Sequence, residues 1–396
     1  MKKTIAFLAI ILFVTAGCGR GKRSSTVIRS ADNLITVDVT ASYPEKELIL
    51  QDFMDVEYIP LETNDDFLTQ GVVLAVGKEI ILVKNWINDG DIFIFDRKTG
   101  KGLRKINRKG QGGEEYLYIT GVVLDENNNE IFVNSSSTKK ILVYDLYGKF
   151  KRSYNHAKDT QYSDILFNYD TDHLICYDMS GYYKDGEDRG NQSYHAIISK
   201  QDGSITQEIS IPFKKIKAPA VRTGDATAVT LAVLPIIPYR GNWILVETSC
   251  DTVYNYVPND NTSHPFIVRT PSIHSMDPEI FLTLGTLTNR YYFIKTIKKI
   301  FDSATGREFP MSGLMYDKQE NALFNFSVYN GDYTEKKGVD MTTRPLDHEI
   351  AAGHILEAYR LVDDYEKGLL KGRLKEIAAE LDEESNPVIM LVKYKN

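Results

Sequence analysis

The side chains that could carry out chemistry are scattered along this chain. Its seven histidines include no pair spaced four residues apart with a carboxylate between them, which is the arrangement of a helical zinc site. The sequence also contains no Gly-x-Ser-x-Gly nucleophile turn and no glycine-rich phosphate loop between a strand and a helix. It therefore predicts no metal site, no cofactor and no catalytic residue.

Aromatic and polar side chains outside the predicted strands are better candidates for binding. Loop aromatics with polar neighbours suit stacking on a sugar or contact with a peptide, and the loop 108–116 adds flexible glycines, charges and an amide. The candidate binding residues are Trp86, Arg108, Gln111, Glu114, Tyr116, Tyr182 and Tyr183. A second interpretation of the loop stays open: it crosses between two structural units, with Tyr116 packed between sheets and Glu115 bound to backbone amides.

Several of these loops belong to a supersecondary unit that is written twice between Glu79 and Asp145. Each copy has short runs rich in Val, Ile, Phe and Tyr, which are typical of β-strands. The copies are offset by roughly the 40 to 50 residues of a propeller blade. Each copy also contains a turn that runs from an Asp to a Gly. Glycine suits such a turn because it adopts positive φ at little cost. The repeat predicts an all-β chain of four-stranded antiparallel blades that stack around an axis to bury both faces.

Weaker strand patterns continue after the repeat. They predict three further blades at 165–209, 230–269 and 281–328, the second of which begins with a strand at 230–234.

The C-terminal part changes its period. Leu369, Leu374 and Leu381 recur at helical spacing behind Asp363 and Asp364, which predicts one small amphipathic helix before a last strand at 388–392. Strand-like segments at 35–39 and 56–61 precede the first full blade. We therefore expect a sixth blade that joins C-terminal strands to an N-terminal one and closes the ring like a clasp.

Three runs of the sequence resemble a known family. They are Tyr58-Ile59-Pro60-Leu61-Glu62-Thr63, Ile94-Phe95-Asp96-Arg97, and Arg108-Lys109-Gly110-Gln111-Gly112 followed by Glu115-Tyr116. These look like the six-bladed β-propeller lipoproteins of Bacteroidota, most of which are uncharacterised. Gly113 and Glu114 stand where the family usually has Pro-Gly. The resemblance implies a six-bladed propeller in the cell envelope, and it brings no catalytic residues with it.

The first residues read as a lipoprotein signal. Lys2 and Lys3 precede the apolar run 5–14, which is too short to span a bilayer and ends on Thr15-Ala16-Gly17 before Cys18. This ending resembles a bacterial lipobox, which implies that residues 1–17 are removed and that Cys18 carries the lipid. Cleavage by an ordinary signal peptidase, with Cys18 incidental, is the alternative.

Residues 18–30 are small, polar and basic, which predicts a flexible tether. In the family that this chain resembles, acidic residues after the lipidated cysteine favour the cell surface. Because Arg20, Lys22 and Arg23 stand there instead, we expect an outer-membrane lipoprotein that faces the periplasm.

Charge and length narrow the partners and the domain count. Removal of residues 1–17 leaves 45 basic against 54 acidic residues, a net charge of −9 with both signs interspersed, so we expect no nucleic-acid partner. The repeat spans most of the mature chain, which predicts a single propeller domain over 31–396. Cys176 and Cys250 could pair in an oxidising compartment or pack as small apolar groups, and the sequence leaves both open.

Two functions compete at this stage. A membrane-tethered module that binds a glycan, a peptide or an envelope protein, in the service of uptake, fits the tether and the loop aromatics. The alternative is a lactonase-like hydrolase or lyase with a metal in the central channel, which needs Glu, Asn or Asp on the inner strands. The inner strands predicted at 72–76 and 119–124 are mainly apolar, which favours the binding module over an enzyme.

Overall fold

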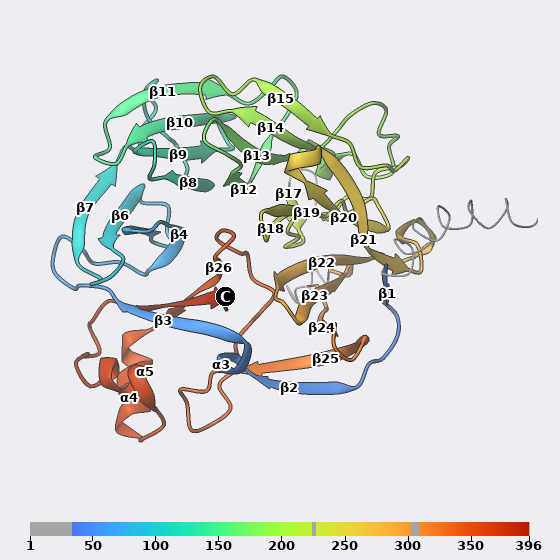
Figure 1. Cartoon of the computed structure of the whole chain (residues 1–396). Coiled ribbons are helices and arrows are strands. Elements are labelled where there is room, and N and C mark those ends of the chain that lie inside the picture. The colour runs from blue at the N-terminus through green and yellow to red at the C-terminus, as the bar shows by residue number, and fades with distance from the viewer. Residues whose placement is uncertain (1–33, 224–226, 302–308, 396) are drawn as a thin grey trace, which may run out of the picture.

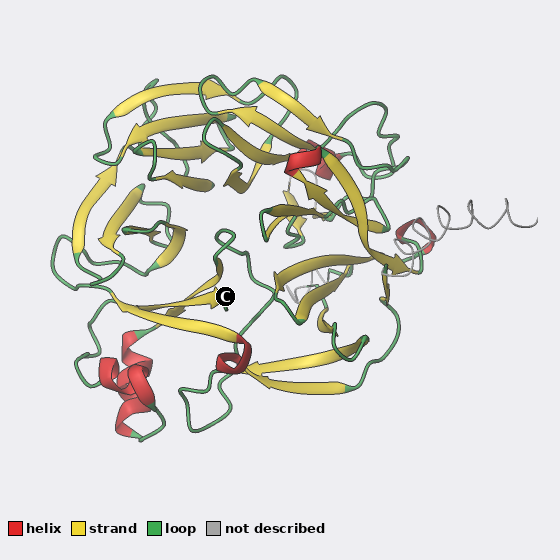
Figure 2. Cartoon of the chain, viewed as in Figure 1, coloured by secondary structure: helices red, strands yellow, loops and turns green. Residues whose placement is uncertain are grey.

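The computed structural model describes residues 34–223, 227–301 and 309–395 of the chain. Its strands form six sheets arranged like blades around a central axis, and a separate two-stranded hairpin, β16 (Ala220–Thr223) with β17 (Thr227–Thr230), stands apart from them (Figures 1 and 2). The six-bladed β-propeller expected from the repeat is confirmed. The signal segment 1–17, the tether 18–30 and Cys18 lie outside the described residues.

Blades 1 to 3 are regular, and each holds four antiparallel strands. Blade 1 contains β4 (Val72–Val76), β5 (Ile80–Lys84), β6 (Asp91–Asp96) and β7 (Gly102–Asn107); blade 2 contains β8 (Gly121–Asp125), β9 (Glu130–Ser135), β10 (Lys140–Asp145) and β11 (Phe150–Asn155); blade 3 contains β12 (Tyr162–Asn168), β13 (His173–Asp178), β14 (His195–Ser199) and β15 (Ile205–Ile209). The strand β9 is buried throughout, because neighbouring blades cover both of its faces. The outermost strands β7 and β11 alternate between exposed and covered positions.

Blades 4 and 5 each gain a fifth strand, and blade 6 has three. Blade 4 contains β18 (Ile236–Tyr239), β19 (Asn242–Leu245), β20 (Thr252–Val257) and β21 (Thr262–Thr270); blade 5 contains β22 (Ile280–Leu287), β23 (Tyr291–Lys298), β24 (Met311–Asp317) and β25 (Ala322–Tyr329); blade 6 contains β26 (Ile350–Leu356), β27 (Val388–Tyr394) and β3 (Met54–Pro60). The added strands are β1 (Ile35–Asp38), which pairs in parallel with β21, and β2 (Glu45–Ile49), which pairs in parallel with β25.

The N-terminal segment thus forms a belt around one half of the ring. Its strands β1, β2 and β3 join the outer edges of blades 4, 5 and 6 in turn, as the blue ribbon in Figure 1 shows. In blade 6, β3 pairs antiparallel with β27, from Met54 opposite Tyr394 to Pro60 opposite Val388. The expected clasp is therefore present, and the two ends of the chain meet in the closing blade.

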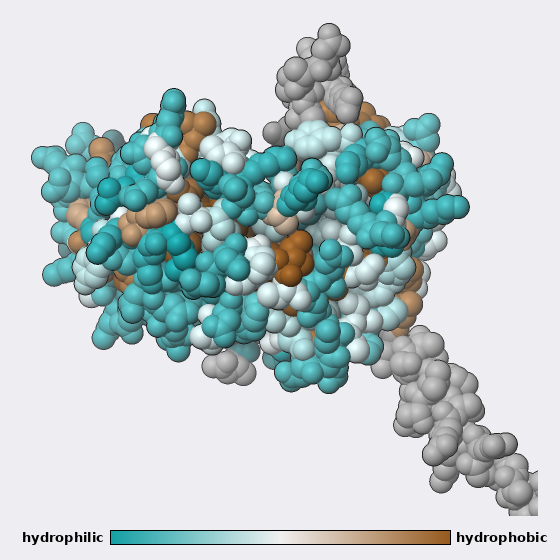
Figure 3. All heavy atoms as spheres, turned by 90° about the horizontal axis from the view of Figure 1, so that it is seen from above, coloured by the Kyte–Doolittle hydropathy of each residue, from teal (hydrophilic) through white to brown (hydrophobic). Residues whose placement is uncertain are grey.

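The core is divided into layers between adjacent blades. Six buried clusters lie between blades 1 and 2, 2 and 3, 3 and 4, 4 and 5, 5 and 6, and 6 and 1. Each blade therefore depends on two neighbours for burial, and the ring gains its full apolar contact only when it closes. The outer wall faces water: seen from the side of β11 and β15, the surface is mostly hydrophilic (Figure 3).

Two sequence expectations need correction. Blade 4 begins with β18 (Ile236–Tyr239) rather than at 230–234, because β17 ends at Thr230 and residues 231–234 form a connection without strand structure. One C-terminal helix was expected, but two short ones are present, α4 (Ala358–Glu366) and α5 (Gly372–Ala378). Gly368 and Gly372 adopt positive φ between them and break the helix, so Asp363 and Asp364 lie inside α4 rather than at a helix start.

The remaining helical turns are short. They are α3 (Leu50–Phe53), η1 (Met179–Tyr183), η2 (Pro258–Asp260) and η3 (Ile273–Ser275). Within the described ranges, every helix falls short of the length and apolar character needed to cross a bilayer.

Candidate functional site

The propeller has two faces that differ in their connections. One carries the turns between the first and second strands of each blade, and we call it the turn face. The other carries the connections between blades and the turns between second and third strands, and we call it the loop face. Because consecutive strands are antiparallel, Trp86 and the loop 108–116 both lie on the loop face, at blade 1.

The loop 108–116 is built as a crossing between blades 1 and 2. Tyr116 is 0% exposed, and its hydroxyl donates to the Gly90 carbonyl (2.7 Å) and accepts from the Arg108 amide (3.0 Å). Its ring meets Tyr144 edge-on, with 6.0 Å between the centroids. Burial raises the pKa of Tyr116 to about 12. Tyr116 cannot present its ring to a ligand, which corrects its place among the binding candidates.

The polar residues of this loop are exposed but partly engaged. Glu115 accepts from the Gly112 amide (2.8 Å), as the packing interpretation expected. Arg108 donates from Nε to the Gly148 carbonyl of blade 2 (2.9 Å), and the Glu114 carbonyl accepts from the Tyr144 hydroxyl (2.7 Å). Gln111 is exposed to solvent. The loop therefore holds two blades together, and its outward side chains remain at the surface.

Tyr182 and Tyr183 belong to blade 3 and lie far from Trp86 along the ring. Both fall in η1, where the Asp178 side chain accepts from the Ser180 amide. The Tyr182 ring packs against Tyr177 with 6.0 Å between the centroids, and burial raises its pKa well above the ordinary range. Tyr183 is 46% exposed. The sequence candidates thus share one face without converging on one site.

Trp86 instead belongs to a group of exposed apolar side chains on blade 1. Leu68, Trp86, Ile87 and Tyr118 are 64%, 66%, 67% and 49% exposed, and they come from three adjacent connections. Hydrogen bonds fasten these connections together: the Gln70 side chain accepts from the Trp86 amide (2.7 Å), and Asn88 donates to the Leu117 carbonyl (3.3 Å). We call this group the loop patch.

The central channel is filled by the chain itself. Residues 341–349, the channel segment, run through it before β26 begins. The Met341 carbonyl accepts from Thr286 of blade 5 (2.9 Å), and Arg344 donates to the Asp164 and Leu166 carbonyls of blade 3 (3.0 and 3.2 Å). A cavity of about 90 Å³ remains beside the inner strands. That is well below the roughly 300 Å³ at which small-molecule sites begin, so the channel offers little room for a substrate.

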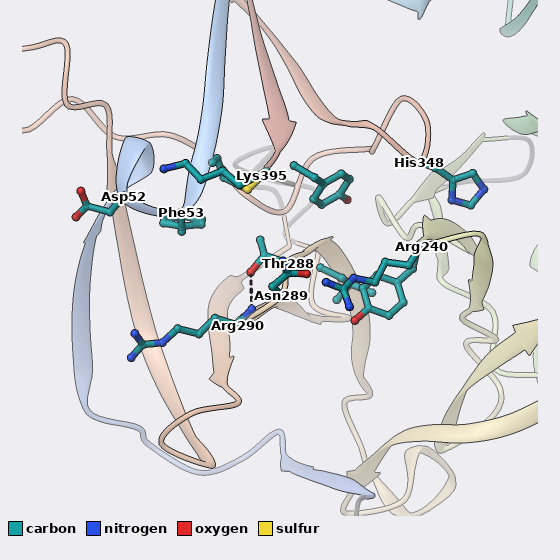
Figure 4. A pocket seen from close by; sticks show the side chains of 12 residues that line it. Asp52, Phe53, Arg240, Thr288, Asn289, Arg290, His348 and Lys395 are labelled. Carbon is teal, nitrogen blue, oxygen red and sulfur yellow. Dashed lines mark hydrogen bonds between the residues drawn. The ribbon is translucent and has the colours of Figure 1, made fainter.

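Another cavity lies on the turn face, where the two ends of the chain meet. It holds about 490 Å³ and sits between the turns of blades 4 and 5 and the ends of β3 and β27 (Figure 4). We call it the seam cavity. It is lined by Asp52, Phe53, Met54, Tyr239, Arg240, Leu287, Thr288, Asn289, Arg290, His348, Tyr394 and Lys395.

The seam cavity combines ring surfaces with polar groups. Phe53 is fixed by Tyr291 and Phe293, at centroid distances of 5.2 and 5.8 Å. The Tyr239 hydroxyl lies 3.0 Å from the Tyr292 hydroxyl. These contacts hold the walls in place before any ligand arrives, which lowers the entropic cost of binding.

Its two arginines are in different situations. Arg290 points away from the cavity in Figure 4, and its guanidinium donates to Asp317 (2.8 Å), whose side chain is fully buried. Arg240 reaches toward Asn289, and within the described ranges it has neither a hydrogen bond nor an ion pair; it makes a cation–π contact with Tyr239 at 5.9 Å. The charge of Arg240 is therefore available.

His348 forms the end of the cavity near the axis. Its ring meets Trp243 edge-on at 4.7 Å, and burial lowers its pKa, so the imidazole is neutral near pH 7. Its Nδ1 is buried and has no hydrogen-bond partner within the described ranges. Lys395 donates to the Gln51 carbonyl (2.7 Å), which ties the C-terminal end to the N-terminal belt.

Sequence reasoning missed this site because its residues come from five separate segments. The sequence offers one signal of the site, which is the arginine of Arg240-Gly241. These two residues join two strands, and a two-residue turn between strands favours residues that accept positive φ. The part of the cavity lining that comes from the two chain ends can be predicted only when the way the ring closes is known.

Metal and thiol chemistry have few candidates. Across residues 34–223, 227–301 and 309–395, no group of three or more His, Cys, Asp or Glu side chains is placed to hold a metal ion. Cys176 and Cys250 are both free thiols, and burial raises the pKa of Cys250 to about 11. Neither is a reactive thiolate near neutral pH.

Comparison with known proteins identifies the family. The family described as "DUF5128: 6-bladed beta-propeller" matches residues 27–350. The chain belongs to this family. No curated protein matches it.

A solved structure agrees with the DUF5128 fold. A Bacteroides fragilis protein described as exported is 15% identical, with 92% of this chain and 99% of that chain covered and a TM-score of 0.56. A DUF4221 family member from Bacteroides vulgatus is 11% identical, with 87% and 98% covered and a TM-score of 0.45. At 15% identity, the likeness to the Bacteroides fragilis protein shows the fold alone and leaves function to the site itself.

Proposed function

We propose that this DUF5128 propeller is a lipid-anchored envelope protein that binds a small organic ligand in the seam cavity. The single observation that carries the proposal is the cavity: its volume of about 490 Å³ lies within the roughly 300 to 1,000 Å³ of small-molecule sites. Its walls combine aromatic rings with a few polar groups, which suits a glycan fragment or a short peptide.

The anchor is the second part of the proposal. Cys18 follows a signal of lipoprotein type, and the tether 18–30 gives the domain freedom to move near a membrane. The Bacteroides fragilis protein of the same fold is described as exported, which agrees with passage through the inner membrane. We place the protein at the outer membrane, facing the periplasm.

A thermal-shift screen of the soluble domain with sugars and short peptides tests the ligand site. We expect hits that raise the melting temperature of the wild type and have no effect on Asn289→Trp, which fills the cavity from an exposed turn. The matched control is Asn127→Trp, on the equivalent exposed turn between β8 and β9 of blade 2. Hits that survive Asn289→Trp, or no hit at all, would contradict the proposal.

The anchor is tested separately by fractionation. We expect the wild type to sediment with membranes and incorporate labelled palmitate, and Cys18→Ala to do neither. A Cys18→Ala protein that still partitions fully with membranes would show that the anchor is wrong.

The loop patch supports a second candidate function, which is contact with an envelope protein. Four large apolar side chains held at the surface by hydrogen bonds are typical of an interaction site. A photoreactive residue at position 87 should then give a discrete cross-linked band in cells that Trp86→Glu removes. The control position is Tyr147, which is 79% exposed on the turn face of blade 2. Equal labelling from both positions would argue against a specific contact.

A further inference from the structure

Arg240 stands at a turn position that disfavours arginine. β18 and β19 are joined by two residues, since Tyr239 pairs with Asn242, and Arg240 and Gly241 have φ of 50° and 76°. Two consecutive positive φ values define the type I′ hairpin turn, whose first position favours Asn, Asp or Gly. A side chain with a Cβ and a long stem is strained there.

The rest of the described chain follows this preference. Six of its non-glycine residues have positive φ, and four of them are Asn or Asp: Asn129, Asp159, Asn261 and Asn321. Lys139 and Arg240 are the exceptions. Only Arg240 of these two lines the seam cavity. A strained residue that persists beside a cavity points to a role for its side chain.

The electrostatic surroundings of Arg240 are also unusual. Lys318 lies on the neighbouring turn of blade 5. Burial lowers the pKa of Lys318, and the nearby positive charge of Arg240 lowers it further. Arg290, the next cation of the cavity, is already neutralised by Asp317. Among the described residues that line the cavity, Asp52 is the only one with a carboxylate side chain, and it lies at the opposite end from His348 in Figure 4. An anion beside Arg240 would therefore relieve an uncompensated positive charge.

The donors beside Arg240 complete a site for a planar anion. The guanidinium presents parallel N–H groups that match the two oxygens of a carboxylate. Asn289, toward which Arg240 points, is exposed, and its side-chain amide makes no hydrogen bond within the described ranges. Phe53 and Tyr239 supply ring surfaces for the apolar part of a ligand.

We infer that the ligand of the seam cavity carries a carboxylate and that Arg240 binds it. This inference rests on the proposed function, because it names the chemical class of ligand for the same cavity. The carboxylate belongs either to an acidic sugar or to the free C-terminus of a peptide, and both present the same two oxygens to Arg240.

Calorimetric titration of the soluble domain with matched pairs of ligands tests this inference. The pairs are galacturonate with galactose, and Ala-Ala-Phe with its C-terminal amide. For the pair from the correct source, we expect the acid to bind the wild type about tenfold or more tightly than the neutral partner, as one charge-assisted pair is worth. The preference should weaken with added salt.

The decisive variant is Arg240→Asn, because asparagine suits the turn better than arginine. We expect it to melt at the same or a higher temperature than the wild type and to bind acid and neutral partner equally. Arg360→Asn, which removes an exposed arginine from α4, is the control and should keep the preference. A variant that is well folded and has lost only the acid preference cannot be explained by a purely structural role.

The outcomes separate this inference from the proposed function. If acid and neutral partners bind equally well and Asn289→Trp blocks both, the cavity is the ligand site and the carboxylate inference is wrong. An acid preference that survives Arg240→Asn also overturns it. If neither pair binds and Asn289→Trp changes nothing, both proposals fail.

Discussion

Blades 1 and 2 and the seam of blades 4 to 6 are assembled in different ways. The first two blades are continuous stretches of chain that repeat one pattern. Asp96 in blade 1 and Asp145 in blade 2 accept hydrogen bonds in corresponding turns. The seam is assembled from distant segments: the N-terminal belt, the C-terminal strand, two hairpin turns and the channel segment. The repeated part contains well-filled layers, whereas the assembled part leaves a cavity. Repetition supplies stability in this ring, and the interruption of the repeat leaves the cavity that we propose as the ligand site.

The largest effect should come from removing the clasp. Deletion of residues 387–396 takes away β27, whose residues Val388 to Val392 are 0 to 2% exposed. Burial of five such side chains is worth roughly 10 kcal/mol, which is comparable to the whole stability of a typical domain. We expect the truncated protein to lose its cooperative unfolding transition in calorimetry.

The control for this deletion is removal of residues 395 and 396, which leaves β27 intact. If the protein without residues 387–396 melted within a few degrees of the wild type, neither the repeated blades nor the seam would depend on closure of the ring.

A core residue of the repeated part comes next. Tyr116→Ala should lower the free energy of unfolding by about 3 to 5 kcal/mol, because it removes a fully buried ring and two hydrogen bonds. Tyr118→Ala, two residues further on and 49% exposed, should change it by less than about 1 kcal/mol. Denaturant unfolding measures both, and equal losses would mean that the loop does not act as a packed crossing.

Acid should weaken the blade layers while sparing the proposed site. Burial lowers the pKa of His156 and His195 from the ordinary 6.5 to about 4. Between these values the unfolded chain binds protons that the folded chain does not, so their contribution to stability is lost as the pH falls from 6.5 to 4. Each ring accounts for about 2 to 3 kcal/mol.

The pH effect can be assigned by substitution. Unfolding free energies at pH 7.5 and 5 should differ less for His156→Gln than for the wild type. Carboxylate binding should persist at pH 5, because guanidinium groups in general remain charged there and carboxylates remain ionised above a pKa of about 4. If the His156→Gln protein kept the full wild-type pH dependence of stability, His156 would not contribute to the loss of stability in acid.

The smallest expected difference separates two arginines of one cavity. Burial raises the pKa of Asp317, but hydrogen bonds from Arg290 and Lys46 outweigh it and hold that pKa below its ordinary range. Arg290→Ala should therefore cost about 1 kcal/mol of stability, because Lys46 still pairs with Asp317. Arg240→Ala should cost almost nothing, and thermal denaturation distinguishes the two. A larger loss for Arg240→Ala would show that its guanidinium is structural.

The sequence was sufficient wherever local pattern decides structure. The strand Val72–Val76 was predicted to the residue, because it is an apolar run bounded by turn residues. The clasp also followed from strand signals at both ends. The helix pair and the start of blade 4 did not, since Gly368 and Gly372 break an apparent period and the apolar run 231–234 lies in a connection before β18.

The site could not be read in the same way. Tyr116 and Trp86 look alike in sequence, as aromatic residues in polar loops, and only packing shows that one is buried and the other exposed. Arg240 and Asn289 meet because blades 4 and 5 pack together, and His348 reaches the same cavity from the channel segment, more than a hundred residues after Arg240. No local pattern encodes that meeting, so the seam cavity became visible only in three dimensions.

The central claim is that the assembled seam, rather than the repeated blades, is where a ligand binds. A crystal structure of the soluble domain with the tightest acidic ligand from the titrations tests it most directly. We expect the ligand in the seam cavity, with its carboxylate within hydrogen-bond distance of the Arg240 guanidinium. Density for the ligand on the loop face, between Trp86 and Arg108, with the seam cavity empty, would contradict the account.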